Sequence, residues 1–221
     1  MRKVIVGAMV SMDGVMQAPG GPQEDPTGGF KFGGWVAPVA DSDPVFREEI
    51  SKLFSEPFDL LLGRRTYDIF AAYWPYAEGD IAKTFNRITK YVATRKGVDL
   101  TWKGSVALRD AAKDVAQLKQ EDGHVLVTQG STELVHALLA AGLVDEIRTF
   151  IFPLLLGKGK RLFSGDSQPR AFKLTHSAVS PNGLIATTYV RDGEVKTATV
   201  GGAVEPSATE LARREKLKRE G

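Results

Sequence analysis

The stretch Phe58-Asp-Leu-Leu-Leu-Gly-Arg-Arg-Thr-Tyr-Asp-Ile-Phe-Ala-Ala-Tyr-Trp-Pro75 predicts a strand that runs directly into a helix. Its unbroken run of leucines suits a strand that is covered on both faces, and one glycine separates that strand from a short helical pattern. The unpaired N–H groups and the positive dipole end at the start of a helix favour an anion. The guanidinium groups of Arg64 and Arg65 would strengthen a phosphate site there. The alternative is that both arginines are solvated surface residues at an ordinary turn.

The composition limits the chemistry that the side chains can perform. The chain has 221 residues, of which 43% are hydrophobic and 25% charged, and its formal net charge of +2 gives no reason to expect a nucleic-acid partner. Cysteine is absent, which excludes disulfides and thiolate chemistry, and the three histidines lie far apart, so no metal site is expected. There is neither a membrane-spanning apolar run nor a signal-peptide pattern, so we expect a cytoplasmic protein without a membrane partner.

Two further strands end in residues that suit a phosphate. The strand over residues 89–95 ends in Thr94-Arg-Lys96, and the strand over residues 124–128 runs into Gln129-Gly-Ser-Thr132 at the start of a helix. If these strands and the first one are neighbours in a parallel sheet, their ends meet at one edge and fit an extended ligand with several phosphates. Arginines in these turns, without an acidic residue, favour the 2′-phosphate of NADP over the hydroxyl of NAD.

The first predicted strand covers Lys3–Val10. The segment that follows it contains Asp13, whose carboxylate allows two interpretations. The sequence Ser11-Met-Asp-Gly14 places Asp13 in an Asp-Gly pair, which is a strong turn signal. Asp13 could equally be a functional carboxylate at the end of a central strand, where open α/β sheets place their ligand clefts. The glycine-rich loop over residues 17–42 is similarly ambiguous, because Trp35 could belong to a lid over a flat ligand or could anchor the loop on the core.

The remaining elements follow from periodicity and turn residues. Asp43 and Pro44 are typical of a helix cap and first helical position, and an amphipathic helix is expected from Leu108 to Leu118. From residue 172 the period changes to two, which predicts an antiparallel meander with strands near residues 172–178, 184–191 and 194–200. We therefore expect one domain over residues 1–200, followed over residues 201–221 by a charged tail that forms a solvated or frayed helix.

Five motifs in order connect these features to a known family. They are Ser11-Met-Asp-Gly14, Gly63-Arg-Arg-Thr-Tyr67 with Tyr73-Trp-Pro75, Gly130-Ser131 followed by Leu134-Val135, Gly142-Leu-Val-Asp-Glu146, and Pro153-Leu-Leu-Leu-Gly-Lys-Gly-Lys-Arg-Leu-Phe163. Together they resemble the dihydrofolate-reductase-like superfamily, in the branch that contains the reductase domain of bacterial riboflavin biosynthesis. The resemblance covers residues 1 to about 195. It implies a three-layer α/β/α fold whose sheet is mixed, mostly parallel and eight-stranded, with NADPH as the hydride donor and often a homodimer.

The resemblance also implies roles for individual residues. Residues 63–66 (Gly63, Arg64, Arg65 and Thr66) would meet the adenosine and phosphates of the cofactor, and Thr94 and Arg95 its 2′-phosphate. The pyrophosphate would lie on residues 129–132, which are Gln129, Gly130, Ser131 and Thr132. Asp13 matches the aspartate near the reacting centre and is the catalytic candidate, and we expect the substrate to contact Trp35, Phe152 and Leu155.

The sequence departs from the family in ways that leave the substrate open. Dihydrofolate reductases carry a tryptophan followed by an acidic residue at the entry to their first helix, whereas Val-Ala-Pro follows Trp35 here. The deaminase motifs of the bifunctional riboflavin enzyme are also missing from the 221 residues. The implied activity is therefore hydride transfer to a C=N or C=O bond of a pterin or a ribosyl-aminopyrimidine-like compound, the latter as in 5-amino-6-(5-phosphoribosylamino)uracil reductase. The alternative is a non-catalytic nucleotide-binding or regulatory protein that retains the fold.

Overall fold

The computed structural model describes residues 1–95, 99–163, 167–202 and 205–220. Its strands are β1 (Val4–Ser11), β2 (Phe58–Gly63), β3 (Lys90–Ala93), β4 (Ser105–Leu108), β5 (Val125–Gln129), β6 (Glu146–Phe152), β7 (Phe172–Val179) and β8 (Ile185–Arg191). The α-helices are α1 (Ala37–Ala40), α2 (Pro44–Leu53), α3 (Arg64–Tyr73), α4 (Asp80–Arg87), α5 (Ala111–Gln120), α6 (Thr132–Ala140) and α7 (Ala208–Glu220), and a 3-10 turn, η1, spans Thr27–Gly29.

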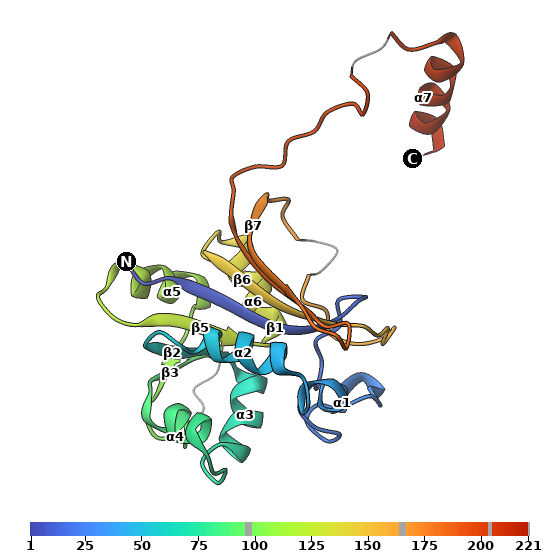
Figure 1. Ribbon diagram of the computed structural model, residues 1–221. Helices are drawn as coiled ribbons and strands as arrows, with labels where there is room; N and C mark the ends of the chain where they lie inside the picture. Colours follow the sequence, from blue (N-terminus) through green and yellow to red (C-terminus); the bar gives the residue numbers. More distant parts are fainter. Residues whose placement is uncertain (96–98, 164–166, 203–204, 221) are drawn as a thin grey trace.

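The strands form one mixed sheet in the order β4-β3-β2-β5-β1-β6-β8-β7 (Figure 1). The pairs from β4 to β6 are all parallel, whereas β8 is antiparallel to both β6 and β7. The mixed, mostly parallel eight-stranded sheet that the family resemblance implied is therefore confirmed. In this topology the carboxyl ends of β2, β3 and β5 lie at the same edge, where open α/β sheets bind their ligands.

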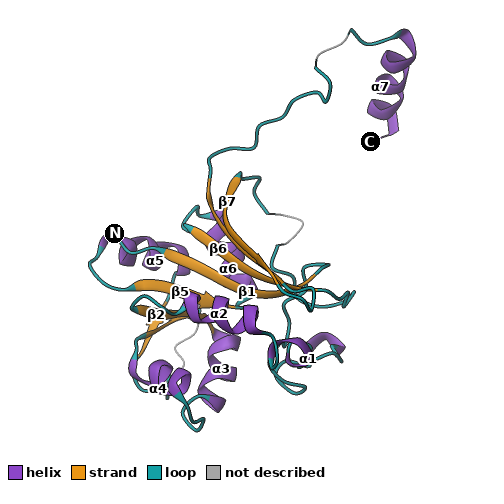
Figure 2. Ribbon diagram, in the orientation of Figure 1, coloured by secondary structure: helices purple, strands orange, loops and turns teal. Residues whose placement is uncertain are grey.

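Helices cover both faces of the sheet, which makes three layers (Figure 2). One core lies between the sheet and α1–α4, and the other between the sheet and α5 and α6. The leucines of β2 show how one strand serves both cores. Leu60 and Leu62 belong to the first core and Leu61 to the second, and all three are fully buried. This agrees with the expectation of a strand covered on both faces, since successive side chains point to opposite sides of a sheet.

Aspartate side chains cap the starts of α2 and α5. The carboxylate of Asp43 accepts a hydrogen bond from the Phe46 N–H (2.9 Å), and Pro44 occupies the first position of α2, as predicted. Asp110 caps α5 in the same way by accepting from the Lys113 N–H (3.1 Å). The predicted helix from Leu108 is thus wrong in its first turn, because Ser105–Leu108 forms the edge strand β4 and the helix begins at Ala111. A strand of four residues is too short to show an alternating pattern.

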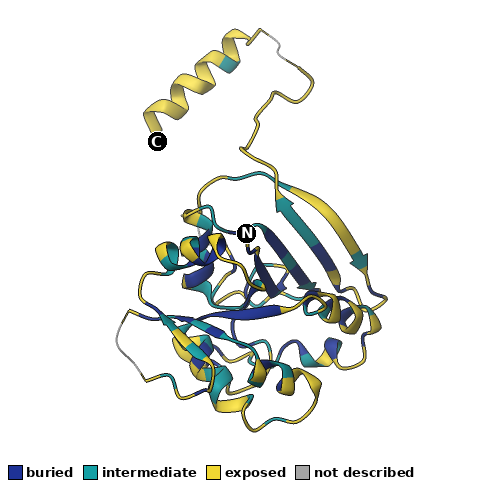
Figure 3. Cartoon of the chain, turned by 90° about the vertical axis from the view of Figure 1, so that its left-hand side faces the viewer, coloured by how far each residue is buried: buried dark blue, intermediate teal, exposed yellow. Residues whose placement is uncertain are grey.

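The carboxyl-terminal part of the chain differs from the predicted meander. The hairpin of β7 and β8 is present, but the predicted third strand over residues 194–200 is wrong, because these residues form neither strand nor helix and are all exposed. The edge strand β7 pairs with β8 alone among the described strands, so residues 194–200 have no ladder to join. α7 lies apart from the sheet without a buried residue, as Figures 1 and 3 show, and this agrees with the solvated helix expected for the tail.

Candidate functional site

The sheet splits between two neighbouring strands at its ligand-binding edge. β2 and β5 pair from Phe58 with Val125 to Leu60 with Val127, and no further. Beyond that point β2 stays paired with β3 up to Gly63, while β5 stays paired with β1 up to Gln129. The diverging ends leave a cavity of about 1090 Å³ over the carboxyl ends of the strands. A cavity of this size is slightly above the usual range for small-molecule and cofactor sites.

The cavity brings together the turns that the sequence analysis singled out. Its wall includes every residue predicted to contact the cofactor: Gly63, Arg64, Arg65, Thr66, Thr94, Arg95, Gln129, Gly130, Ser131 and Thr132. Lys96, which was considered with Thr94 and Arg95, lies outside the described residues. Three strand ends that are distant in sequence therefore face one volume.

The turn from β2 to α3 presents both arginines to the cavity. Arg64 forms a two-pronged contact with Asp68 one turn along α3, with Nε at 2.8 Å from Oδ1 and 2.9 Å from Oδ2. Arg65 reaches across the mouth of the cavity and donates to the Thr27 hydroxyl (3.2 Å). Since the Arg64–Asp68 pair is exposed, it is weak and can be exchanged for a stronger anionic partner. The two guanidinium groups thus serve different parts of the cavity.

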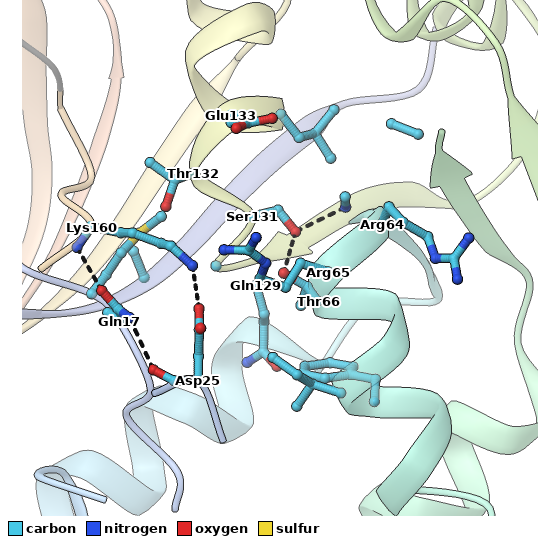
Figure 4. Close-up of a pocket in the computed structure, with 18 of the residues that line it drawn as sticks. Gln17, Asp25, Arg64, Arg65, Thr66, Gln129, Ser131, Thr132, Glu133 and Lys160 are labelled. Carbon is cyan, nitrogen blue, oxygen red and sulfur yellow. Dashed lines mark hydrogen bonds and ion pairs between the residues drawn. The ribbon is translucent and has the colours of Figure 1, made fainter. Parts of the chain in front are cut away.

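The turn from β5 to α6 has a backbone conformation suited to an anion. Gly130 and Ser131 both have positive φ angles, 67° and 64°. Ser131 occupies the position before α6, but its side chain does not cap that helix. Its hydroxyl instead accepts from the Gly63 N–H (2.9 Å) and donates to the Thr66 hydroxyl (2.8 Å) (Figure 4). The first N–H groups of α6 consequently have no cap from this side chain, which is the arrangement of a phosphate site at a helix start.

A second wall of the cavity is built by side chains that the sequence analysis missed. In Figure 4, Gln17, Asp25 and Lys160 lie together, on the side of the cavity away from Arg64. Gln17 accepts from the Lys160 N–H (3.1 Å) and donates to the Asp25 carbonyl (2.9 Å), and the Lys160 ammonium pairs with the Asp25 carboxylate. Burial alone would raise the pKa of Asp25, but hydrogen bonds from Lys160 and Thr27 lower it below its ordinary value. Asp25 is therefore an ionised anchor for Lys160.

The pKa of Glu24, the residue before Asp25, is shifted in the opposite direction. It lines the cavity, and burial raises the pKa of its carboxyl although Gly20 and Gly21 donate backbone hydrogen bonds to it. Those bonds, of 2.6 and 3.1 Å, both end on Oε2. Two neighbouring carboxyl groups whose environments shift their pKa values in opposite directions are a common feature of sites that use one acid and one anion.

Asp13, the predicted catalytic residue, is not among the residues that line this cavity. Its carboxylate accepts hydrogen bonds from the Ser11 hydroxyl (2.6 Å) and from the N–H groups of Leu156 (3.1 Å) and Gly157 (2.9 Å), and Arg161 lies 3.2 Å away. These contacts, led by that of Ser11, lower its pKa to about 2. These bonds hold the loop after β6 against the end of β1, and the catalytic role of Asp13 stays a prediction.

The three residues predicted to contact the substrate also lie elsewhere. The Trp35 indole donates to the Gln17 carbonyl (2.8 Å) and packs edge-on against Phe152, so it anchors the loop as in the alternative interpretation. Phe152 is fully buried, and Leu155 is 69% exposed. None of the three is among the cavity-lining residues. The apolar part of the cavity wall is formed instead by residues that include Met9, Ile50, Phe70 and Phe150.

Arg109 is a further cationic residue of the cavity wall that sequence reasoning missed. It follows β4 directly, as Arg64 follows β2 and Arg95 lies two residues beyond β3. The missed edge strand explains the omission, because an arginine is recognised as part of such a site only once its strand is known. Gln17, Asp25 and Lys160 gave no comparable signal, since their contacts join segments more than a hundred residues apart.

Comparison with known proteins places this architecture in a family. The model of the family described as the RibD C-terminal domain matches residues 2–186. The chain belongs to this family. Over 197 residues it is 24% identical to the uncharacterised protein YyaP of Bacillus subtilis strain 168, an alignment that covers 87% of the chain and 96% of YyaP. Membership in the RibD C-terminal domain family supports a reductase role for the chain.

Solved structures show that the RibD C-terminal domain fold of this chain is dihydrofolate-reductase-like. A candidate riboflavin biosynthesis protein of Shewanella sp. PV-4 superimposes with a TM-score of 0.60 at 20% identity, covering 86% of this chain and 99% of that one. The dihydrofolate reductase of Enterococcus faecalis gives 0.56 at 14% identity, with coverage of 86% and 96%. Within the described residues, no helix is long and apolar enough to cross a membrane, and no group of acidic and histidine side chains could hold a metal ion.

Proposed function

We propose that the protein is an NADPH-dependent reductase that transfers a hydride to a C=N or C=O bond of a small heterocyclic substrate of the pterin or ribosyl-aminopyrimidine kind. One observation carries this proposal: the turns after β2, β3 and β5 line a single cavity across the split in the sheet. The dihydrofolate reductase of Enterococcus faecalis, which shares the fold, was solved with NADP(H). The cofactor would supply the hydride. The protein then has to bind and orient the cofactor and the substrate, and to keep water out of the site.

The residues of the cavity fit the parts of this cofactor. Residues 130–132, at the start of α6, offer backbone N–H groups to a pyrophosphate, with Arg65 nearby as a cation. Arg64, Arg95 and Arg109 come from three successive strand ends and offer guanidinium groups to a 2′-phosphate. Lys160, held by Asp25, adds positive charge from the opposite wall.

Glu24 is our candidate for the group that holds the proton of the reaction. Its carboxyl lies in the cavity wall and has a raised pKa because of burial, whereas Asp25 and Asp13 are held ionised by their partners. Asp43, Glu48 and Glu49 are not among the residues that line the cavity. Asp43 caps the helix and accepts from Asn182 (3.0 Å), and Glu49 pairs with His176 and Lys52. The substrate ring would rest on the apolar part of the cavity wall, which includes Ile50, Phe70 and Phe150.

We also propose that two copies of the chain associate through the outer face of β7 and β8. The register places on that face Phe172, Leu174, Ser177, Val179, Ile185, Thr187 and Tyr189, with the charged Arg191 at its end. Of these, Leu174 is 48% and Val179 67% exposed. Light scattering should give twice the chain mass of 24.0 kDa, and Leu174→Lys with Val179→Lys should give the monomer. A wild-type protein that is monomeric at micromolar concentration contradicts this.

Two measurements test the proposed function. Titration with NADPH and NADH, followed by cofactor fluorescence, should show tight binding of NADPH and at least roughly tenfold weaker binding of NADH, the size of one charge-assisted contact. A panel of pterins and ribosyl-aminopyrimidines should then contain a compound that consumes NADPH. Absence of NADPH binding refutes the proposal, while NADPH binding with no consumption in a broad panel supports the non-catalytic alternative.

A further inference from the structure

Ser131 makes a side-chain connection across the split in the sheet. The ladder between β2 and β5 ends at Leu60 and Val127, so the last residues of the two strands have no backbone bonds to each other. Ser131, which follows β5, accepts from the Gly63 N–H at the end of β2 (2.9 Å) and donates to the Thr66 hydroxyl in the first turn of α3 (2.8 Å). One hydroxyl group thus joins the starts of α3 and α6 where the sheet itself no longer does.

The backbone on both sides of the split is shaped for this contact. Ser131 adopts the left-handed conformation, with φ of 64°, which is uncommon for a residue with a side chain and carries a conformational cost. A Cβ atom at Gly63 would lie 3.2 Å from the Ser131 Cβ and 3.3 Å from its hydroxyl, closer than most real contacts. The glycine at the end of β2 is therefore explained by the approach of Ser131. Both features indicate that the turn after β2 and the turn after β5 are in close contact at Gly63 and Ser131.

We propose that Ser131 is a positioning residue that sets the distance between the two phosphate-binding turns, and thereby matches the cleft to a whole dinucleotide. This rests on the proposed function, because the turn after β2 carries Arg64 for the 2′-phosphate and the turn after β5 carries the N–H groups for the pyrophosphate. The Ser131 hydroxyl has one proton to donate, and it donates that proton to Thr66, so it has none left for a phosphate oxygen. Ser131 therefore acts on the cofactor through the two turns and not through its own oxygen.

The substitution that tests this is Ser131→Gly. Glycine adopts positive φ without cost, so this variant removes the hydroxyl while relieving the backbone, and it should fold. Hydrogen exchange of the Gly63 amide, followed by NMR in the protein without cofactor, should accelerate by at least about tenfold, since a protected amide becomes free. The Leu61 amide, inside the same strand, serves as the internal control and should not change.

Binding of a dinucleotide and of its two halves separates positioning from direct contact. NADPH should bind Ser131→Gly about tenfold more weakly, the scale of one or two neutral hydrogen bonds. Reduced nicotinamide mononucleotide lacks the 2′-phosphate and should bind within about twofold of wild type, whereas 2′,5′-ADP carries the 2′-phosphate and one phosphate of the pyrophosphate, spans the split and should lose affinity in step with NADPH. If the serine hydroxyl touches the pyrophosphate itself, the mononucleotide, which carries one of its phosphates, loses as much affinity as NADPH.

A double-mutant comparison with Thr66→Val gives a second, independent result. If the Thr66 hydroxyl acts through Ser131, the double variant binds NADPH no more weakly than the weaker single variant, within about twofold. If the losses of NADPH affinity in the two single variants multiply in the double variant, the proposal is overturned. For Ser131→Gly, an unchanged Gly63 exchange rate, an unchanged NADPH affinity, or a mononucleotide that loses affinity in step with NADPH also overturns it. If the wild type fails to bind NADPH, the proposed function is wrong, whereas the exchange measurement still decides whether the bridge exists.

Discussion

Replacement of Arg64 by alanine should separate NADPH from NADH, because the two cofactors differ only in the 2′-phosphate. In the free protein Arg64 is paired with Asp68, and their side chains are 37% and 51% exposed. An exposed pair of this spacing on a helix contributes about 0.3–0.5 kcal/mol. A charge-assisted hydrogen bond to phosphate contributes about 1.5–3 kcal/mol. Exchange of one partner for the other therefore leaves about 1–2.5 kcal/mol for NADPH binding.

That free energy corresponds to a loss of affinity of roughly fivefold to sixtyfold for NADPH in Arg64→Ala. Cofactor fluorescence measures the dissociation constants, and NADH, which lacks the phosphate, should change by less than about twofold. Asp68→Asn is the matched variant, because it removes the competing carboxylate and should tighten NADPH binding by about twofold, the equivalent of the lost pair. Equal losses for NADPH and NADH in Arg64→Ala would refute the assignment of Arg64 to the 2′-phosphate.

Three further predictions concern the tail and the carboxylates. Truncation at Gly201 should lower the melting temperature by less than about 5 °C, because α7 buries no residue; a larger drop means that the tail docks. Asp13→Asn should lower it by about 5 °C, because the amide nitrogen that replaces one carboxylate oxygen cannot accept from Gly157. The Asp13 pKa is lowered to about 2, so its contribution to wild-type stability is present above about pH 3.8 and lost as the pH falls through about 2; an acid unfolding profile shared with Asp13→Asn refutes this. Glu24→Gln should reduce turnover by about 10²–10⁴-fold and remove the decline of kcat/KM as the pH rises past the raised pKa of Glu24, while full turnover means that another group or water supplies the proton.

The parts of the fold that could be predicted depend on neighbouring residues. The strand ending at Gly63, the helix that follows it and the cap at Asp43 are each encoded within a few positions, and the structure has all three. The edge strand β4 was missed because its four residues carry no period of their own. Arg109 was missed for the same reason, because its place beside the other arginines follows from the parallel pairing of β4 with β3.

The second wall of the site depends on contacts that no local pattern encodes. The Lys160–Asp25 pair joins residues separated by 135 positions, and the Lys160–Gln17 bond joins residues separated by 143. A similarly large separation in sequence explains why the role of Asp13 was ambiguous, since its partners Leu156 and Gly157 come from the loop after β6. Trp35 illustrates a related difficulty, because an aromatic residue in a glycine-rich loop has the same sequence pattern whether it covers a ligand or anchors the loop.

In the proposed complex, one dinucleotide bridges the split between β2 and β5. A crystal structure with NADPH bound would show whether it does. We expect the pyrophosphate on the N–H groups of residues 130–132 and the 2′-phosphate within about 3 Å of the Arg64 guanidinium, the range of a charge-assisted hydrogen bond. A dinucleotide bound away from the split, or one whose 2′-phosphate points away from the ends of β2 and β3, would contradict the account.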